Sequence, residues 1–424
     1  MGLRLTDEQH NALVGCCEWY FDTSYNKKNY YIISGYAGTG KTTIIYTLIQ
    51  ILGLASYNVL FAAYTSKAAL ILRMKGNMAN TIHKSFYNIY YSSTGEYYFK
   101  VKKSLPSMIK LIVIDEFSMI NDKMINDILS FNLPVIFLGD IGQLPPIIGR
   151  NTFLEDVSNI DAQLTKILRQ EDSSGVLELA TMARNGEELK IGKYKNSRVL
   201  YLKDVKNIEE YDVILCWKNS TRKIFNQSLR KVLGYNALYP QKGEKVIGLK
   251  NNYFHQIEYD GVPIFPVNGL PSICTSDAEV VKKNKLIKLG YKPDFISDEG
   301  PEFNTLCHPD YFDVYNADLE REPFIENDDD DIVHLDYGYC LSVYKAQGSQ
   351  YKRGLLLDEF RGSKDINNKF IYTGLTRFSM GVDFVKDYER WEGFPLISQI
   401  RIIISLDIYI IYSIKGYVYI LNVK

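Results

Sequence analysis

Short apolar runs alternate with segments of helical period along the first 165 residues of the chain. Strands are predicted at 30–34, 59–63, 110–114 and 134–138. Helices are predicted after a loop at 35–42 to about residue 52, after the strand at 59–63 through residue 74, and at 118–130. A further helix opens the chain, with Thr6 as its N-cap. Strands that alternate with helices are joined by right-handed crossovers, so this pattern predicts an α/β domain whose parallel sheet is covered on both faces.

The alternation resumes after Leu164, with a helix at 174–185, a strand at 213–217 and a helix at 220–233. From about 234 to 331, short apolar stretches alternate with Gly, Pro and Asn, which predicts an all-β insertion that forms a small barrel. The α/β pattern returns from 333 to 385. We therefore expect four parts: a first α/β domain at 1–155 with a hairpin insertion at 85–107, a second α/β domain at 156–235 plus 332–390, a barrel at 236–331, and a tail at 391–424.

Composition adds limits to this picture. The 424 residues carry a net charge of -1, so any nucleic-acid site must rely on local positive charge in a groove. The six cysteines lack metal-ligand spacing, which favours free thiols over a zinc site. The polar N-terminus predicts no signal peptide, and Arg401, Asp407 and Lys415 interrupt the apolar tail, which argues against a membrane span. We expect a cytoplasmic protein, in the host cytoplasm if it is phage-encoded.

A glycine-rich loop follows the first predicted strand. Its sequence, Gly35-Tyr36-Ala37-Gly38-Thr39-Gly40-Lys41-Thr42, fits G-x-x-x-x-G-K-[ST] between a strand and a helix. The glycines allow backbone N–H groups to wrap phosphates, and the helix N-terminus adds positive potential. Lys41 is expected to reach the β- and γ-phosphates of ATP, and Thr42 to bind Mg²⁺. The expected nucleotide contacts at the loop are Gly35, Gly38, Thr39, Gly40, Lys41, Thr42 and Thr43.

Two later strands end in further polar residues. The strand at 111–114 delivers Asp115 and Glu116 to its carboxyl end, where ligands bind in such sheets. Asp115 is expected to hold Mg²⁺, and Glu116 to accept a proton from the attacking water. The strand at 134–138 leads into Gly139-Asp140-Ile141-Gly142-Gln143-Leu144-Pro145-Pro146, where the Gln143 amide could hydrogen-bond both the γ-phosphate and that water.

These three segments resemble motifs I, II and III of superfamily-1 helicases, and later segments continue the series in order. Residues 65–69 resemble motif Ia, 81–83 motif Ib, 164–170 motif IV with Arg169, 343–349 motif V, and 372–377 motif VI with Arg377. Gln9 resembles the glutamine that reads adenine in this family. The resemblance covers about residues 5–388 and is strongest to the RecD/Dda-like branch, within it to the Dda helicases of T-even phages.

This resemblance implies two RecA-like parallel-sheet motor domains, with a β-hairpin pin inserted in the first and a β-barrel in the second. It implies ATP-driven movement on single-stranded DNA, 5′ to 3′, and unwinding of duplex in replication, recombination or repair. The implied catalytic residues are Lys41, Glu116, Gln143, Arg169 and Arg377, with Gln9 and Gly348 also at the nucleotide. The implied DNA contacts are Thr65, Lys67, His83, Tyr90, Tyr97, Phe99, Lys345 and Ser349.

Single-stranded and fork DNA are thus the expected partners of a monomer, together with single-strand-binding or other replication proteins. Three positions depart from the family pattern: Tyr36, Tyr64 and Tyr344 replace the more usual Pro or Gly, Pro, and His. A phosphate-loop kinase or GTPase is an alternative that leaves motifs IV to VI unexplained. A recombination or packaging factor that holds ATP only as a structural ligand is another. Residues 416–420 are faintly similar to the first strand of GIY-YIG-type nucleases, although a packed β-strand is favoured.

Overall fold

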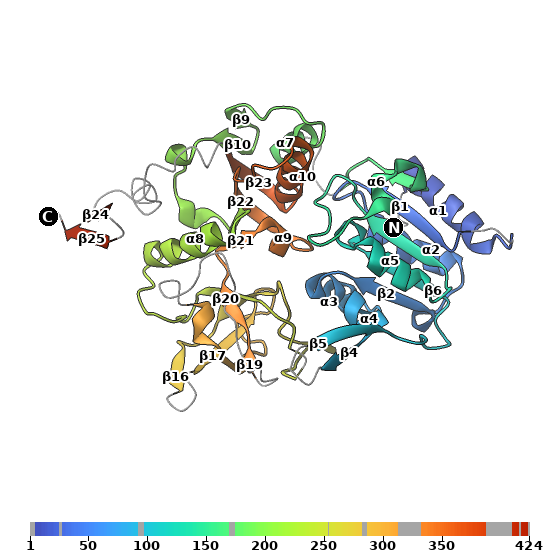
Figure 1. Ribbon diagram of the computed structural model, residues 1–424, viewed down its shortest axis with the longest axis horizontal. Helices are drawn as coiled ribbons and strands as arrows, with labels where there is room; N and C mark the ends of the chain where they lie inside the picture. The colour runs from blue at the N-terminus through green and yellow to red at the C-terminus, as the bar shows by residue number, and fades with distance from the viewer. Residues whose placement is uncertain are drawn as a thin grey trace. The chain divides into compact units, whose positions relative to one another are not determined.

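The computed structural model describes residues 5–24, 28–91, 97–168, 174–252, 254–281, 286–312, 332–386, 409–414 and 417–422 (Figure 1). The chain divides into two compact units, Met1–Asp172 and Ser173–Lys424. Each unit contains its own six-stranded sheet, and the second also carries a seven-stranded antiparallel-rich sheet.

The first unit is built on a six-stranded sheet in the order β3-β2-β6-β7-β1-β8. Every neighbouring pair of strands is parallel, as the alternation of strands and helices predicts. The strands are β1 (Tyr30–Gly35), β2 (Val59–Ala63), β3 (Ala79–Thr81), β6 (Leu111–Asp115), β7 (Val135–Gly139) and β8 (Ala162–Leu164).

Both faces of this sheet are covered, because apolar residues occupy successive positions of each central strand. Ile33 and its neighbours on one face pack against α1 (Asp7–Phe21), α2 (Lys41–Ile51) and α3 (Ser66–Met74). Ile32 and its neighbours on the other face pack against α4 (Ile82–Phe86), α5 (Asp122–Leu129) and α6 (Thr152–Glu155). Short 3-10 turns lie at η1 (Ser56–Asn58), η2 (Phe117–Met119) and η3 (Val157–Asn159).

A two-stranded antiparallel hairpin projects from this unit after α4. It comprises β4 (Tyr87–Tyr91) and β5 (Tyr97–Val101), with Tyr90 opposite Tyr98. Its base is tied to the unit at two points. The Tyr87 hydroxyl donates to Asp127 at 2.8 Å, and the Lys102 ammonium donates to the carbonyl oxygens of Lys84 and Ser85 at 2.7 and 2.9 Å.

The second unit contains a sheet in the order β21-β11-β22-β23-β10-β9, in which only β9 runs antiparallel to its neighbour among these strands. Helices α7 (Gly175–Arg184), α8 (Asn219–Val232), α9 (Val343–Ala346) and α10 (Lys364–Leu375) accompany it, with 3-10 turns η4 (Leu202–Asp204) and η5 (Ile208–Glu210). The strands are β9 (Gly192–Tyr194), β10 (Ser197–Leu200), β11 (Val213–Cys216), β21 (Cys340–Ser342), β22 (Tyr351–Leu357) and β23 (Phe378–Val385).

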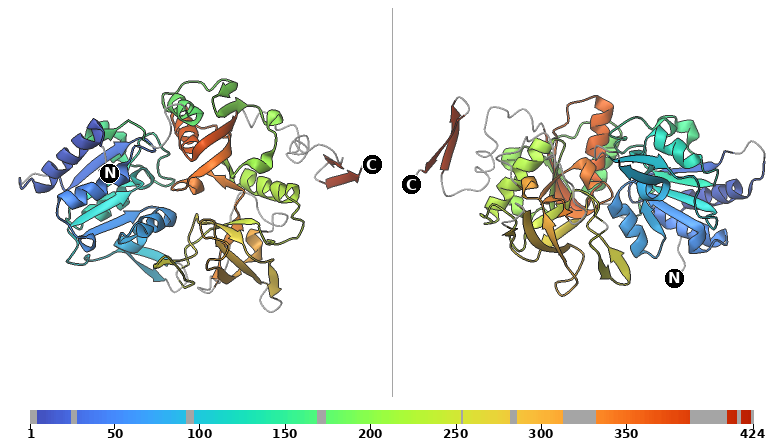
Figure 2. Two further views of the ribbon diagram at one scale, coloured as in Figure 1. Left: turned by 180° about the vertical axis from the view of Figure 1, so that it is seen from behind. Right: turned by 60° about the horizontal axis from the view of Figure 1, so that its bottom comes forward.

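Seven further strands of the second unit form a barrel-like sheet in the order β19-β18-β17-β15-β12-β20, with β16 beside β17. Its two end strands, β19 and β20, are separated in sequence only by His334, so the sheet must curl back on itself. Figures 1 and 2 show these strands grouped apart from the α/β sheet of the same unit. They are β12 (Lys245–Gly248), β15 (Pro271–Cys274), β16 (Glu279–Val281), β17 (Leu286–Pro293), β18 (Phe303–Cys307), β19 (Ile332–Val333) and β20 (Leu335–Tyr337); β13 (Ile257–Tyr259) pairs with β14 (Val262–Ile264), and η6 (Pro309–Tyr311) follows β18.

Two expected boundaries differ from the structure, and strand pairing explains both. The first domain was expected to end at 155, yet β8 pairs with β1 and extends the first sheet to Leu164. The barrel was expected to end at 331, yet β19 pairs with β18 and β20 with β12, so the barrel sheet continues to Tyr337. The helix expected at 118–130 begins only at Asp122, because η2 occupies 117–119.

In the tail, β24 (Tyr409–Ile414) and β25 (Tyr417–Asn422) form an antiparallel hairpin and pair only with each other among the described strands. Within the part of the chain that the structure describes, no helix has both the length and the apolar character needed to cross a membrane.

The stacked phenylalanines under the first sheet provide a test of its packing. Phe137 on β7 is fully buried, and its ring lies 4.3 Å from that of Phe117, centroid to centroid. We expect Phe137→Ala to lower the free energy of unfolding by about 3–5 kcal/mol, because it removes contacts and leaves a cavity. Urea denaturation measures the loss. Ile51→Ala on an exposed helix end should change stability by less than about 0.5 kcal/mol, and equal effects would contradict the packing.

Candidate functional site

The phosphate-type loop joins β1 to α2 in the first unit. Gly38 and Gly40 have φ angles of 82° and 80°, in the left-handed region that favours glycine. A side chain at Gly35 would place its Cβ 2.9 Å from Leu164 Cβ and from the Thr39 hydroxyl. The loop is further held by Thr39, whose hydroxyl donates to the Tyr36 carbonyl at 2.9 Å. Its shape therefore depends on the glycines that the motif supplies.

Lys41 and the start of α2 bring positive charge to this loop. The Lys41 ammonium donates to the carbonyl oxygens of Gly35 and Tyr36 at 2.8 and 2.9 Å, so it lies over the loop. The N-cap of α2 is Gly40, which has no side chain to satisfy the first N–H groups of the helix. Backbone donors at a helix start, beside an ammonium group, are the features that bind phosphate.

Thr42 and Asp115 meet at the carboxyl edge of the sheet. The Thr42 hydroxyl donates to Asp115 Oδ2 at 3.1 Å, although the two residues are far apart in sequence. Hydroxyl and carboxylate oxygens are the ligands that Mg²⁺ prefers, so this pair fits the ion beside a phosphate chain. Glu116 follows in the left-handed region at φ 56°, and its N–H donates to Asp115 Oδ1 at 2.9 Å. A non-glycine residue held in this conformation often marks a functional site.

Gln143 lies on the loop after β7 and is 6% exposed. Its Oε1 atom has no hydrogen-bond partner in the described part of the chain, an uncommon condition for a buried amide. The loop is shaped by the buried Asp140, whose side chain accepts from the Gly142 N–H at 2.9 Å and whose carbonyl accepts from the Gln143 N–H at 3.0 Å. The loop therefore positions the Gln143 amide, and its Oε1 atom is available to accept a hydrogen bond.

Gln9 has a contact that its sequence pattern does not reveal. Its Oε1 accepts from the Thr6 N–H at 3.0 Å in a capping box at the start of α1, and its Nε2 donates to the Thr39 carbonyl at 2.9 Å. The buried side chain thus ties α1 to the phosphate-type loop. Reading of adenine by Gln9 remains a prediction, whereas its support of the loop is visible in the structure.

The expected DNA contacts of the first unit fall at helix starts and on the hairpin. The Thr65 hydroxyl accepts from the Ala68 N–H at 3.2 Å and caps α3, on which the half-buried Lys67 also lies. His83 on α4 lies in an aromatic cluster, with ring centroids 4.8 Å from Phe99, 5.8 Å from Tyr87 and 6.3 Å from Tyr64. Burial lowers the pKa of His83, which favours its neutral form.

The hairpin presents aromatic rings on its surface. Tyr90 and Tyr98 are 42% and 54% exposed, and their rings stack with centroids 5.7 Å apart and an interplanar angle of 19°. Phe99 is also exposed at its position on β5. Tyr98 was missed by the sequence analysis, although its position opposite Tyr90 on a hairpin would have revealed it. The structure places Tyr97 on β5, but its side chain lies outside the described residues.

The second unit holds the remaining predicted residues. Arg377 follows α10 and is buried, and it donates to the Thr373 carbonyl at 3.0 Å and to the Thr376 hydroxyl at 3.1 Å. Lys345 lies on α9, Gly348 follows in the left-handed region at φ 74°, and the nearby Ser349 is buried.

Gln347 and Arg169 belong to the same half of the motif series. Gln347 is 1% exposed, and neither atom of its amide has a partner in the described residues. Gln347 was not among the predicted site residues, although it lies inside the segment that resembles motif V. Arg169 lies outside the described residues, so the structure gives it no position.

Several known proteins are similar to this chain in sequence. A family model described as an AAA domain matches residues 5–204. The RecD subunit of the RecBCD enzyme of Buchnera aphidicola is 25% identical over 82% of this chain and 69% of its own length. The Dda helicase of phage T4 is 31% identical, but over only 38% of this chain and 39% of its own length. The uncharacterized protein MJ1519 of Methanocaldococcus jannaschii is 24% identical over 82% of this chain. This chain spans only 36% of the length of MJ1519.

Solved structures share the fold. The Pif1 helicase of Candida albicans has a TM-score of 0.55 at 16% identity, over 91% of this chain and 95% of that one. A Bacteroides Pif1 bound to single-stranded DNA has a TM-score of 0.53 at 16% identity, over 94% and 96%.

A glycine-rich loop, an acidic strand end and an all-parallel sheet together define the class of phosphate-loop nucleotide-binding proteins with RecA-like sheets. Within that class, the chain is similar in sequence to RecD and Dda helicases, and it shares its fold with Pif1 helicases. A particular closeness to Dda was expected. The observed similarity to Dda is modest, because it is confined to little more than a third of this chain.

The contact of Gln9 with the loop generates a prediction. We expect Gln9→Ala to raise the KM for ATP about tenfold, because a loop that has lost its tether must be ordered by the nucleotide itself. Steady-state ATPase measurements give this value. His10→Ala, which alters an exposed neighbour on the same helix, serves as the control and should leave KM unchanged. An unchanged KM in Gln9→Ala would show that the tether is unimportant.

The burial of His83 generates a second prediction. Its lowered pKa means that the folded state takes up a proton less readily than the unfolded state, so stability is lost as the pH falls below the unfolded value of about 6.5. We expect His83→Phe in the full chain to lose less stability than the wild type between pH 7.5 and 5.5. Urea unfolding at the two pH values measures this difference, and parallel losses in both proteins would contradict it.

Proposed function

We propose that the protein is an ATP-dependent DNA helicase that moves along single-stranded DNA and separates duplex. The observation that carries this proposal is the convergence of Lys41, Thr42, Asp115, Glu116 and Gln143 at one edge of a parallel sheet, in the order of superfamily-1 motifs. Kinase or GTPase activity would account for the first four residues. It would not account for the later motifs that end at Arg377.

The proposed chemistry is hydrolysis of the terminal phosphate of ATP. Lys41 and the N-terminus of α2 would bind the phosphates, while Thr42 and Asp115 would hold Mg²⁺. The ion, when bound, would neutralise charge on the transferred phosphate. Glu116 would accept a proton from the attacking water, and Gln143 would orient that water through its unused Oε1 atom. Arg169 and Arg377 would stabilise the charge that develops on the phosphate.

The proposed substrate is single-stranded DNA, gripped through stacking and backbone contacts. Thr65, Lys67, Lys345 and Ser349 would supply polar contacts, while His83, Tyr90, Tyr97 and Phe99 would supply aromatic faces. Each stacked base contributes about 1–3 kcal/mol in such proteins, so a few exposed rings on the hairpin are significant. Solved relatives include a Pif1 bound to single-stranded DNA and Pif1 helicases at forked DNA, which supports the same class of ligand here.

Movement along DNA requires that each unit in turn binds DNA tightly and releases it as ATP is bound and hydrolysed. Arg377 belongs to the second unit and Lys41 to the first, so a shared role for them at one nucleotide would couple the units. The 5′ to 3′ direction comes from family resemblance. Strand displacement on substrates with a 5′ or a 3′ tail would decide the direction.

The central test is ATP hydrolysis with and without single-stranded DNA. We expect strong stimulation by DNA, and we expect Lys41→Ala and Glu116→Gln each to lower kcat by at least about 100-fold, because they remove charge stabilisation and the proton acceptor. Hydrolysis that ignores DNA would favour the kinase or GTPase class. DNA binding without turnover would favour a factor that uses ATP only as a structural ligand.

The hairpin provides a test of duplex separation. We expect replacement of residues 90–99 by a tight turn to abolish unwinding and spare DNA-stimulated ATPase activity, because the wedge is removed while the nucleotide site is untouched. A gel-based strand-displacement assay and a coupled ATPase assay measure the two activities. Unwinding at the wild-type rate would overturn the assignment of the hairpin as the wedge.

A further inference from the structure

Helix α8 carries a stripe of buried polar residues. Arg222, Asn226 and Arg230 recur every four residues and therefore share one face of the helix. Their exposed fractions are only 0%, 1% and 3%. Arginine is almost never buried to this extent unless it is paired, so the partners of this stripe define what it holds. We refer to these three residues as the α8 stripe.

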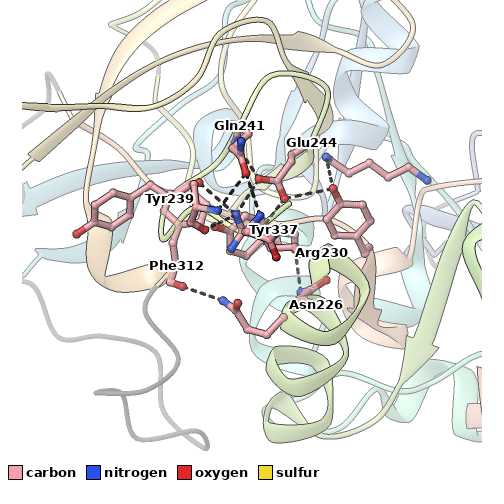
Figure 3. A network of polar contacts seen from close by, with 12 residues as sticks. Asn226, Arg230, Tyr239, Gln241, Glu244, Phe312 and Tyr337 are labelled. Atoms are coloured by element: carbon pink, nitrogen blue, oxygen red, sulfur yellow. Dashed lines mark hydrogen bonds and ion pairs between the residues drawn. The ribbon is translucent and has the colours of Figure 1, made fainter. Parts of the chain in front are cut away.

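Arg230 forms the first point of attachment (Figure 3). Its Nε and Nη2 atoms donate to the two oxygens of Glu244 at 2.6 and 2.9 Å, in a two-pronged ion pair just ahead of barrel strand β12. The buried Glu244 carboxylate also accepts from the Gln241 N–H at 2.8 Å and the Tyr339 hydroxyl at 3.3 Å. The Arg230 guanidinium lies 4.1 Å above the ring of Tyr337 on β20. One side chain of α8 thus contacts residues on or beside two neighbouring barrel strands, β12 and β20.

Arg222 and Asn226 hold the chain where it leaves the barrel. Arg222 forms a fully buried ion pair with Asp336 on β20. The Asn226 amide donates to the carbonyl oxygens of Tyr337 and Cys340 at 3.0 and 3.2 Å, and it accepts from the Cys340 N–H at 2.7 Å. The stripe therefore grips the short segment 336–340 through both side-chain and backbone atoms.

This segment leads directly into predicted DNA contacts. It connects β20 of the barrel to β21 of the α/β sheet, and β21 continues into α9 with Lys345 and on to Ser349. The loop before barrel strand β15 also lies near this turn, because a Cβ atom built on Gly269 would lie 3.6 Å from the Lys345 carbonyl oxygen. A shift of the barrel relative to α8 would therefore change the position of residues 343–349.

We propose that Arg222, Asn226 and Arg230 are positioning residues, which set the barrel against the turn 343–349 and so hold that turn in its DNA-binding geometry. This inference rests on the proposed function. A buried ion pair adds little net stability compared with apolar side chains of the same volume, whereas its directional bonds specify one arrangement. The α8 stripe thus serves geometry more than stability, and its loss should affect DNA affinity more than ATP turnover.

The test is the double variant Arg230→Met/Glu244→Gln in the full chain. Both partners become neutral, so no unpaired charge is left buried and the variant should fold. We expect the DNA concentration that gives half-maximal ATPase stimulation to rise about tenfold, while kcat at saturating DNA stays within about twofold. Lys292→Met is the control, because it removes the ion pair between the largely buried Lys292 of barrel strand β17 and the exposed Asp298, neither of which is a partner of the α8 stripe. This control should leave the half-saturating DNA concentration unchanged.

A second variant keeps the proposal open to refutation if the double variant does not fold by circular dichroism. Arg230→Lys preserves the charge but not the two-pronged geometry, so it should raise the half-saturating DNA concentration by about threefold. An unchanged concentration in a folded, DNA-stimulated variant overturns the positioning role alone. Loss of kcat with unchanged DNA affinity would also overturn it. A wild-type protein whose ATPase ignores DNA would instead overturn the proposed function, and this inference with it.

Discussion

The turn from β1 into α2 is the constraint on which the rest of the protein depends. To bring backbone N–H groups against phosphates, the chain must take the left-handed region at Gly38 and Gly40 and pass close to Leu164 and Thr39 at Gly35. No side chain fits at these points without strain, so glycine is required there. The parallel sheet then places Thr42 beside Asp115, although more than seventy residues separate them. Nucleotide chemistry is therefore a consequence of sheet order and of three glycines.

The sequence predicts the first sheet well because its signals are local. Apolar runs of strand length, helical periods and the loop pattern together give every central strand to within one residue, including Val59–Ala63 and Leu111–Asp115. Boundaries set by long-range pairing were missed. Strand β8 joins the first sheet and β20 joins the barrel through partners far away in sequence, and neither has a local pattern that reveals its partner.

The same distinction applies to individual side chains. The motif residues Lys41, Thr42 and Asp115 were predicted because the family pattern is local in sequence. The tether from Gln9 to Thr39, the unbonded amide of Gln347 and the stripe on α8 were not, because each depends on which distant atom lies opposite. Burial of Arg222 and Arg230 runs against their hydropathy, so composition and periodicity alone place them at the surface. Only the three-dimensional pairing with Asp336 and Glu244 explains them.

The first unit therefore carries a candidate nucleotide site, and the second carries a barrel that buried polar contacts bind to helix α8. If the proposed function holds, the nucleotide bound at Lys41 governs the affinity of the protein for single-stranded DNA. The most direct measurement is fluorescence anisotropy of a labelled oligonucleotide with the protein in ADP or in a non-hydrolysable ATP analogue. We expect the two Kd values to differ by about fivefold or more. Equal Kd values in the two nucleotides would contradict it.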